Sequence, residues 1–502
     1  MSNLSKFNLI KNESSGSINR VGIIDIGSNS VRLVVFDGAI RSPAYFYNEK
    51  VICSLGSDLS SDNLLNIDNK LKAMAALKRF VALAKAMNTN IMAVATAAVR
   101  SSKDGLSFCE EIFKETGLSV IILSGEEEAI LSAQGVLLGW PEANGLVCDL
   151  GGSSLELAEV SKGKIGKAIS CPIGPLNLSN FNNNKMFHHD YVNSKLRNIK
   201  NVFSRSYDNI YLVGGSWRSI ARIQMELIDY PLVVLQNYQM KMSEIKSTIN
   251  WIQKASIKEL RTVSTSSVSR LRLLHSSSII LENLIEIFQP KKLTLSSYGI
   301  REGLLYSSMT SKVRKQDPLL EACRHMELCT ARIPGFGLSL FEFIKPIFKK
   351  NDKQFIRLTK AACFLHDVSW RAHPDYRAEV CFDNAIKANL GGIDHRGRAI
   401  LALAVSFRYK TPKKTVPFAG ILSILNNQER KQAEILGKAM RFGAMLSGSA
   451  ENSMGELYID DAKKVIRLNL NKEHEDICGD VVQQRFSSLA SSMKYKPTIV
   501  FK

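Results

Sequence analysis

Residues 21–33, VGIIDIGSNSVRL, decide the fold, because their pattern returns at residues 147–157 as VCDLGGSSLEL. Each copy is an apolar run, then Asp-x-Gly, two small residues and a Ser, then a second apolar run, with the aspartates at 25 and 149. This pattern predicts a strand, a tight turn and a second strand in both places. Glycine and serine let a turn aim its N–H groups at a phosphate, and the Asp can hold a cation over that phosphate. The repeat therefore predicts a cleft that grips a phosphorylated ligand and Mg²⁺ from both sides.

The overall charge predicts an anionic partner. The formal net charge of the 502-residue chain is +19, which attracts anions over long range. Charge alone does not separate nucleic acid, an acidic membrane surface and a free polyanion. We expect a free polyanion, with no specific nucleic acid and no membrane as partner.

The cysteines and the hydrophobicity favour a cytoplasmic protein. The nine cysteines are scattered and form no C-x-x-C pair, which argues against a disulfide framework and a zinc ribbon. The first 20 residues lack the apolar segment of a secretory signal, and no run of 18 apolar residues occurs. A reducing cytoplasm fits these observations.

The pattern of apolar and polar residues along the chain predicts a flexible tail followed by four structured parts. Residues 21–129 and 130–308 alternate strand and helix patterns, which is typical of α/β lobes in which helices cover a sheet. Residues 313–445 have mostly helical periodicity, and residues 446–502 return to a mixed pattern. Residues 1–20 are polar, rich in Ser and Asn, and read as the tail.

Two segments after predicted strands carry candidate catalytic groups. In Ser124-Gly125-Glu126-Glu127-Glu128, the S-x-x-E spacing of Ser124 and Glu127 is that of a capping box at a helix start. The alternative is that Glu127 places a carboxylate at the joint between the lobes as a general base. Arg100, in the segment after another strand, is either a bidentate phosphate clamp or a surface residue.

Further candidates lie in the two repeats and beyond them. Arg32 and Glu156 hold equivalent positions, so one copy would present a cation and the other a metal-binding carboxylate, unless both simply face outward. Gly214-Gly215-Ser216 follows a strand and is a weaker third phosphate-facing turn.

The helical region contains part of a metal phosphohydrolase signature of the HD type. His325 and the pair His366-Asp367 are present, but no Asp follows in the helical stretch after His395, so we expect an HD-like scaffold without its metal. The basic cluster Arg408-Tyr409-Lys410, with Lys413-Lys414, is either a solvated face or a track for a long polyanion.

The order of these motifs along the chain is typical of one protein family. The chain resembles the exopolyphosphatase/guanosine pentaphosphate phosphohydrolase (Ppx/GppA) family, in particular its alphaproteobacterial branch. The resemblance covers roughly residues 20–310 well and the helical half more loosely. It rests on the following segments: Val21–Leu33, Thr96–Arg100, Ser124–Ala129, Asp149–Glu156, Gly214–Ser216 and Gly299–Leu305.

The resemblance implies two lobes of the acetate-and-sugar-kinase/actin type, and hydrolysis of the terminal phosphate of inorganic polyphosphate with Mg²⁺ by a homodimer. By position, Glu127 would be the catalytic base, and Asp25, Asp149 and Glu156 would hold metal or order water. The residues expected around the phosphates are Gly27, Ser28, Asn29, Ser30, Arg32, Arg100, Gly151, Gly152, Ser153 and Gly215.

The motifs leave three other functions open. The same cleft could hydrolyse guanosine pentaphosphate (pppGpp), a kinase of this fold would transfer phosphate from ATP, and a sensor would bind polyanion or alarmone without hydrolysis. The chain also departs from the family at Ser269-Arg270-Leu271-Arg272, where many members have Glu-Arg-x-Asp. The loss of both acids would strengthen anion binding there or change the local packing.

Overall fold

The computed structural model divides the chain into two compact units, Met1–Gln316 and Asp317–Lys502. It describes residues 20–37, 41–56, 63–179, 185–203, 206–410, 416–448 and 454–502. The predicted tail lies outside the described residues except for Arg20, and so do Lys413 and Lys414. The lobe limits stay predictions.

The first sheet of the first unit has the strand order β3-β2-β1-β4-β5. Its strands are β1 (Val21–Ile26), β2 (Ser30–Phe36), β3 (Tyr45–Ile52), β4 (Asn90–Ala95) and β5 (Val120–Ile122). β1 pairs with β2 and β2 with β3 in antiparallel fashion, whereas β4 runs parallel to β1 and β5 parallel to β4.

The second sheet repeats this topology in the order β10-β11-β9-β6-β7-β8. Its strands are β6 (Asn144–Leu150), β7 (Leu155–Ser161), β8 (Lys164–Cys171), β9 (Asn209–Val213), β10 (Gln239–Met240) and β11 (Lys292–Ser296). Even the register repeats, because Asp25 lies opposite Arg32 in one hairpin and Asp149 lies opposite Glu156 in the other. The duplicated topology confirms the predicted strand–turn–strand repeat and the actin-like pair of lobes.

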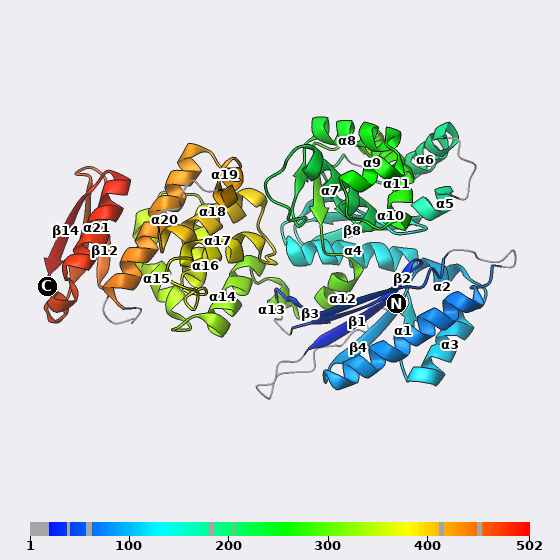
Figure 1. The fold of residues 1–502 in the computed structure, drawn as a ribbon, viewed down its shortest axis with the longest axis horizontal. Helices are drawn as coiled ribbons and strands as arrows, with labels where there is room; N and C mark the ends of the chain where they lie inside the picture. Colours follow the sequence, from blue (N-terminus) through cyan, green and yellow to red (C-terminus); the bar gives the residue numbers. More distant parts are fainter. Residues whose placement is uncertain are drawn as a thin grey trace. The chain divides into compact units, whose positions relative to one another are not determined.

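Helices cover both faces of the first sheet because apolar residues occupy both sides of its strands (Figure 1). On β1, Ile24 and Ile26 pack toward α1 (Ile67–Ala86) and α3 (Gly105–Thr116). Ile23 points the other way, into a core shared with α4 (Gly125–Gly139), α12 (Ile300–Ser308) and the second sheet. This alternation follows from the two-residue period of a strand. The shared core therefore joins the two sheets through α4 and α12.

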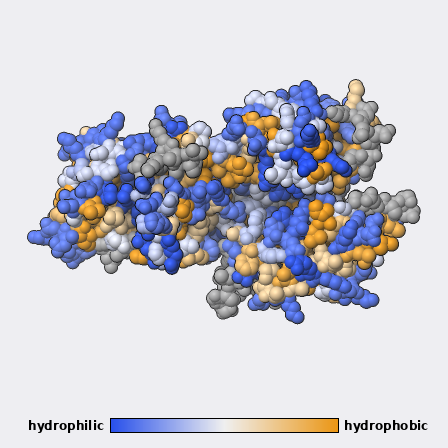
Figure 2. Space-filling view, in the orientation of Figure 1, coloured by the Kyte–Doolittle hydropathy of each residue, from blue (hydrophilic) through white to orange (hydrophobic). Residues whose placement is uncertain are grey.

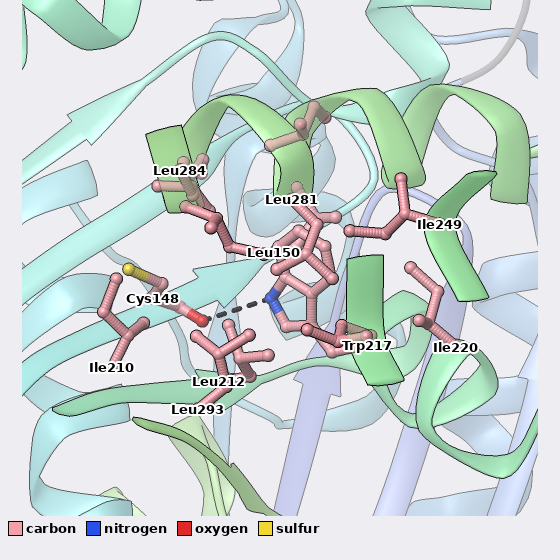
Figure 3. Close-up of a cluster of buried hydrophobic side chains, with 14 of the residues drawn as sticks. Cys148, Leu150, Ile210, Leu212, Trp217, Ile220, Ile249, Leu281, Leu284 and Leu293 are labelled. Atoms are coloured by element: carbon pink, nitrogen blue, oxygen red, sulfur yellow. Dashed lines mark hydrogen bonds between the residues drawn. The ribbon is translucent and has the colours of Figure 1, made fainter. Parts of the chain in front are cut away.

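The second sheet packs on a separate core centred on Trp217. Figure 3 shows this fully buried indole among leucine and isoleucine side chains, with its Nε1–H donating to the carbonyl oxygen of Cys148 at 3.3 Å. Buried Trp stabilises most when its N–H finds an acceptor, as here. The remaining helices of this unit are α2 (Ala97–Ser101), α5 (Pro175–Ser179), α6 (Lys185–Lys200), α7 (Gly215–Leu227), α8 (Met242–Lys254), α9 (Ile257–Thr262), α10 (Val268–Arg272), α11 (Leu274–Phe288) and α13 (Ser311–Arg314).

The second unit is mostly helical and ends in a small mixed sheet. Its helices are α14 (Pro318–Thr330), α15 (Phe336–Ile344), α16 (Lys353–Leu365), α17 (Arg377–Lys387), α18 (His395–Phe407), α19 (Val416–Leu422), α20 (Asn427–Leu446) and α21 (Asp480–Met493). The strands β12 (Glu456–Asp460), β13 (Val465–Leu470) and β14 (Lys496–Phe501) form one sheet in that order. α20 packs against both α18 and α21, so the mixed segment joins the helical core.

The face that Figure 2 shows is mainly hydrophilic, with hydrophobic patches between the hydrophilic residues. Among the described residues, no helix combines the length and hydrophobicity that a membrane crossing requires.

The contact of α4 with α12 depends on small residues and gives a stability prediction. A Cβ added at Gly303 would lie 1.8 Å from the carbonyl oxygen of Leu131, so Gly303→Ala must push the two helices apart. We expect a loss of about 1–3 kcal/mol in the free energy of unfolding, measured by urea denaturation. Gly479→Ala is the control, because its Cβ would meet no atom within 4 Å. Equal stability of the two variants would contradict this account.

Candidate active site

The two Gly-Ser turns meet. The Oγ atoms of Ser28 and Ser153 lie 3.2 Å apart, within one hydrogen bond, although 125 positions separate them in sequence. Both turns close in the same way, because the amide of Gly27 donates to the Ser30 carbonyl and that of Gly151 to the Ser154 carbonyl. The repeats predicted from sequence therefore form one site.

The loop after β3 holds the first turn in place. The amide of Gly56 donates to the carbonyl oxygen of Ser28 at 2.7 Å, and the amides of Cys53 and Ser54 donate to the carbonyl oxygen of Asn29. These bonds occupy the carbonyl side of the turn. A turn fixed in this way is preorganised for a ligand.

A third turn, at the start of α7, lies beside Asp149. Gly214 has φ +117°, and a Cβ there would lie 2.5 Å from the Leu150 carbonyl oxygen and 3.1 Å from Asp149 Oδ1. A Cβ at Gly299 would lie 3.7 Å from Asp149 Oδ2. At Gly214 the positive φ and the close Leu150 carbonyl oxygen favour glycine over any residue with a side chain. The weak sequence signal at Gly214-Gly215 thus marks a real element of the site.

Four carboxylates gather at these turns: Asp25, Glu128, Asp149 and Glu156. Burial raises the pKa of Asp149, although Ser132 Oγ–H donates to its carboxylate. Burial also raises the pKa of Glu156 well above its usual range, and the charges of Glu128 and Asp149 raise it further. Two buried carboxylates that repel each other favour a cation or a proton between them.

Glu128, rather than Glu127, belongs to this group. Glu127 accepts the Ser124 amide at 2.9 Å, while its own amide donates to Ser124 Oγ, so the predicted capping box is present. The next carboxylate, Glu128, is buried and forms an ion pair with Arg100. Burial raises the pKa of Glu128 to about 7 against the opposing charge of Arg100, and Asp149 and Asp25 raise it further. Glu128 therefore joins the buried carboxylates, and the role of base predicted for Glu127 stays a prediction.

Cations complete the site, and sequence analysis missed most of them. Arg301 donates to Asp25 at 2.9 Å, and Lys50 on β3 lies opposite Arg32 on β2. Burial lowers the pKa of Lys50 to about 8, and the charges of Arg270 and Arg32 lower it further. So much positive charge, held near the turns, is suited to bind an anion with several charges.

Arg218 is a further cation of the same group. It stands in the first turn of α7, and its Nη1 donates to the Ser297 carbonyl oxygen at 3.5 Å. Burial lowers its pKa to about 10, and the charges of Arg301 and Arg32 contribute. Arg301 lay within a motif quoted from the sequence, and Lys50 could have been found from its register with Arg32. Nothing in the local sequence marked Arg218.

Two of the arginines predicted to bind phosphate form hydrogen bonds within the protein. Arg100 donates to Glu128 and to the Leu123 carbonyl oxygen, and Arg32 Nε donates to Asn48 Oδ1 at 2.8 Å. Gly215 lies beside Arg270, because a Cβ there would be 3.7 Å from an Arg270 nitrogen. Arg100 therefore orients Glu128 in this structure, whereas Arg270 stands at a phosphate-type turn.

The metal prediction fits part of this site. Across the described residues, no three His, Cys, Asp or Glu side chains are placed to hold a metal by themselves. Mg²⁺ needs fewer protein ligands, because it keeps several waters and takes phosphate oxygens from the substrate. Asp149 and Glu156, opposite each other on one hairpin and both buried, fit this requirement. Asp25 fits less well because Arg301 already neutralises it.

The HD-type residues do not gather as a metal site. Arg332 holds the Asp367 carboxylate with Nε and Nη2, at 2.7 and 2.6 Å. His366 is buried and bonds through Nδ1 to the Cys363 carbonyl oxygen, while His325 Nε2 lies 3.7 Å from Cys329 Sγ. An arginine thus occupies the carboxylate that a metal would need.

Comparison with known proteins places this geometry in a family. The profile described as the Ppx/GppA phosphatase family matches residues 34–312, and the profile described as exopolyphosphatase, C-terminal, matches residues 320–500.

The curated relatives are named for two different activities. The chain is 30% identical to exopolyphosphatase 1 of Mycobacterium tuberculosis over 159 residues, which is 31% of this chain and 46% of that protein. It is 25% identical to guanosine-5'-triphosphate,3'-diphosphate pyrophosphatase of Vibrio parahaemolyticus over 317 residues, which is 60% of this chain and 62% of that protein. The chain thus spans about half the length of these relatives.

A solved structure supports the fold of the first unit. The PPX-GPPA enzyme of Aquifex aeolicus is 27% identical, with a TM-score of 0.50, and the match covers 58% of this chain and 100% of that one.

The lowered pKa of Lys50 gives a prediction about charge in the site. After reductive ¹³C-methylation, the NMR signal of Lys50, assigned by its absence from Lys50→Met, should titrate near pH 8. Added tripolyphosphate should move the titration to higher pH, because an anion stabilises the charged ammonium. A titration that tripolyphosphate does not shift would contradict the placement of Lys50 at an anion site.

Proposed function

The chain belongs to the Ppx/GppA phosphatase family, and on that premise we propose that it is an exopolyphosphatase, which removes the terminal phosphate of inorganic polyphosphate as orthophosphate. The observation that carries the proposal is the buried Glu128, with a pKa of about 7, beside turns suited to bind phosphate. A carboxylate with this pKa can take a proton from water near neutral pH.

The reaction is an in-line attack of water on the terminal phosphorus. Glu128 takes a proton from the water as its oxygen bonds to phosphorus. The bond from that phosphorus to the bridging oxygen breaks, and the shortened polyphosphate leaves with the bonding electrons. Arg32, Arg218 and the amides of the Gly-Ser turns bind the phosphate oxygens on which charge develops.

Asp149 and Glu156 are the residues that would hold Mg²⁺ in this proposal. Asp25 is a weaker candidate ligand because it forms an ion pair with Arg301. Bound Mg²⁺ supplies neutralisation of charge on the phosphate oxygens. The homodimer implied by the family resemblance and the cytoplasmic location expected from the cysteines are part of the same proposal.

The second candidate is hydrolysis of guanosine pentaphosphate, because the match to the Vibrio parahaemolyticus protein extends over more of this chain. The test is orthophosphate release from long-chain polyphosphate and from guanosine pentaphosphate, side by side, with Mg²⁺ and with EDTA. We expect faster, Mg²⁺-dependent release from polyphosphate. Release only from the nucleotide would favour the second candidate, and release from neither would favour a sensor or a kinase.

Adjacent glutamates give a sharp test of the base. Glu128→Gln should lower kcat about 10²–10⁴-fold while polyphosphate still binds, because the general base is lost. Glu127→Gln is the matched control. Glutamine also serves at this position of a capping box, so kcat should stay within about threefold of wild type. The reverse pattern would restore Glu127 as the base.

The raised pKa of Glu128 predicts the acid limb of the pH profile. The base acts only when ionised, so kcat/KM should fall about tenfold per pH unit below about 7. Arg100→Gln should shift this limb to higher pH, because Arg100 stabilises the ionised carboxylate. Steady-state rates between pH 5 and 9 check both statements. An acid limb that Arg100→Gln does not shift would show that the titrating group is not Glu128.

A further inference from the structure

Ser132 on α4 gives its hydroxyl proton to a carboxylate rather than to its own helix. The residue is fully buried, and its Oγ–H donates to Oδ2 of Asp149 on β6. A buried serine inside a helix often donates to the carbonyl oxygen four residues earlier in the same helix. Ser277 on α11 does so, because its Oγ donates to the Leu273 carbonyl oxygen at 2.8 Å. The different choice of Ser132 connects α4 to the candidate active site.

This hydrogen bond makes the two oxygens of Asp149 unequal. Oδ2 accepts from Ser132, whereas no hydrogen bond from the described residues reaches Oδ1. A Cβ at Gly214 would lie 3.1 Å from Oδ1, so the missing side chain leaves space on that side of the carboxylate. Ser132 therefore fixes one oxygen of Asp149, while the other faces the turn at Gly214.

A second serine fixes the neighbouring carboxylate in the same way. Ser170 on β8 lies opposite Glu156 on β7, and its Oγ donates to Glu156 Oε1 at 2.8 Å. Asp149 and Glu156 are themselves partners across β6 and β7. The Cβ atoms of such partners lie about 4.5–5.5 Å apart, on the same face of the sheet. Two neighbouring carboxylates are thus each held at one oxygen by a hydroxyl.

The first two turns of α4 connect both serines to the site. A Cβ at Gly125 would lie 2.8 Å from Ser170 Oγ and 3.8 Å from Arg100 Nη2, so the start of the helix is close to both. Glu128 and Ser132 follow at the i+3 and i+7 positions, which lie on the same side of a helix as Gly125. One side of α4 therefore contacts Ser170, Arg100 and, through Ser132, the carboxylate of β6.

We propose that Ser132 and Ser170 are positioning residues, which hold the carboxylates of Asp149 and Glu156 in the orientation for Mg²⁺. The inference rests on the proposed function, because it takes these two carboxylates as the metal ligands. A carboxylate that is free to rotate loses this freedom when an ion binds, whereas one that a hydroxyl already holds has lost it beforehand. A hydroxyl is also neutral, so it leaves the negative charge of the carboxylate for the cation, which a guanidinium would not.

The test measures metal binding without substrate, so that it does not depend on hydrolysis. The full-length protein is titrated with Mn²⁺, which prefers the same oxygen ligands as Mg²⁺, and the EPR signal of the free ion reports how much stays unbound. Asp149→Asn identifies the relevant binding, because it removes a proposed ligand. Ser132→Ala and Ser170→Ala should each weaken this binding about 10–100-fold, the usual effect of losing a hydrogen-bond partner of a metal ligand.

Ser277→Ala is the matched control for Ser132→Ala. It removes an equally buried helix hydroxyl, but one whose partner is a carbonyl oxygen of its own helix. It should therefore bind Mn²⁺ like wild type, and thermal melting of the metal-free proteins shows whether each variant is folded. Ser170 is only partly buried, so Ser170→Ala keeps the test valid if Ser132→Ala does not fold.

The outcomes separate this inference from the proposed function. Mn²⁺ affinity like that of wild type in the folded serine variants, with binding lost in Asp149→Asn, would overturn the role of the serines and leave the metal site in place. Absence of Mn²⁺ binding, or binding that Asp149→Asn does not change, would overturn the metal site and this inference with it. Orthophosphate release from polyphosphate tests the hydrolysis itself independently.

Discussion

Repulsion among buried carboxylates governs the site of the first unit. Four of them lie at the meeting point of two duplicated hairpins, where burial raises the pKa of Glu128, Asp149 and Glu156. Arg100 and Arg301 each neutralise one carboxylate, and serine hydroxyls satisfy the two others. The charge that stays uncompensated lies on the hairpin of the second lobe. The two hairpins therefore carry unequal charge on equal geometry: Arg32 lies opposite Asp25 in the first, whereas Glu156 lies opposite Asp149 in the second.

Local sequence patterns predicted the two hairpins and the helix cap, because interactions between residues close in sequence determine them. Alternating apolar residues and Gly-Ser turns required two strand–turn–strand units, and both are present as β1–β2 and β6–β7. The S-x-x-E spacing required a capping box, which the Ser124–Glu127 bonds confirm. The actin-like topology followed from the resemblance rather than from the strands themselves, since strand order depends on contacts between distant segments.

The parts that sequence analysis missed depend on tertiary contacts. Adjacent residues on a helix point about 100° apart, so neither spacing nor composition says which of Glu127 and Glu128 enters the site. Lys50 and Arg218 lie near Arg32 and Arg301, although they come from other elements of the chain. In the second unit, the missing Asp after His395 predicted the loss of a metal, but the sequence did not show that Arg332 takes Asp367 instead.

The capping box of α4 has a consequence for the protein's response to heat. Ser124 and Glu127 close the first turn of α4, and Glu128 is part of that same turn. Helix ends fray with smaller free-energy changes than whole domains need to unfold. Each opening of this turn would swing the Glu128 carboxylate away from Arg100 and from the other buried carboxylates. The fraction of molecules with an intact first turn of α4 would therefore decline during warming before either unit melts, and cooling would restore it without refolding.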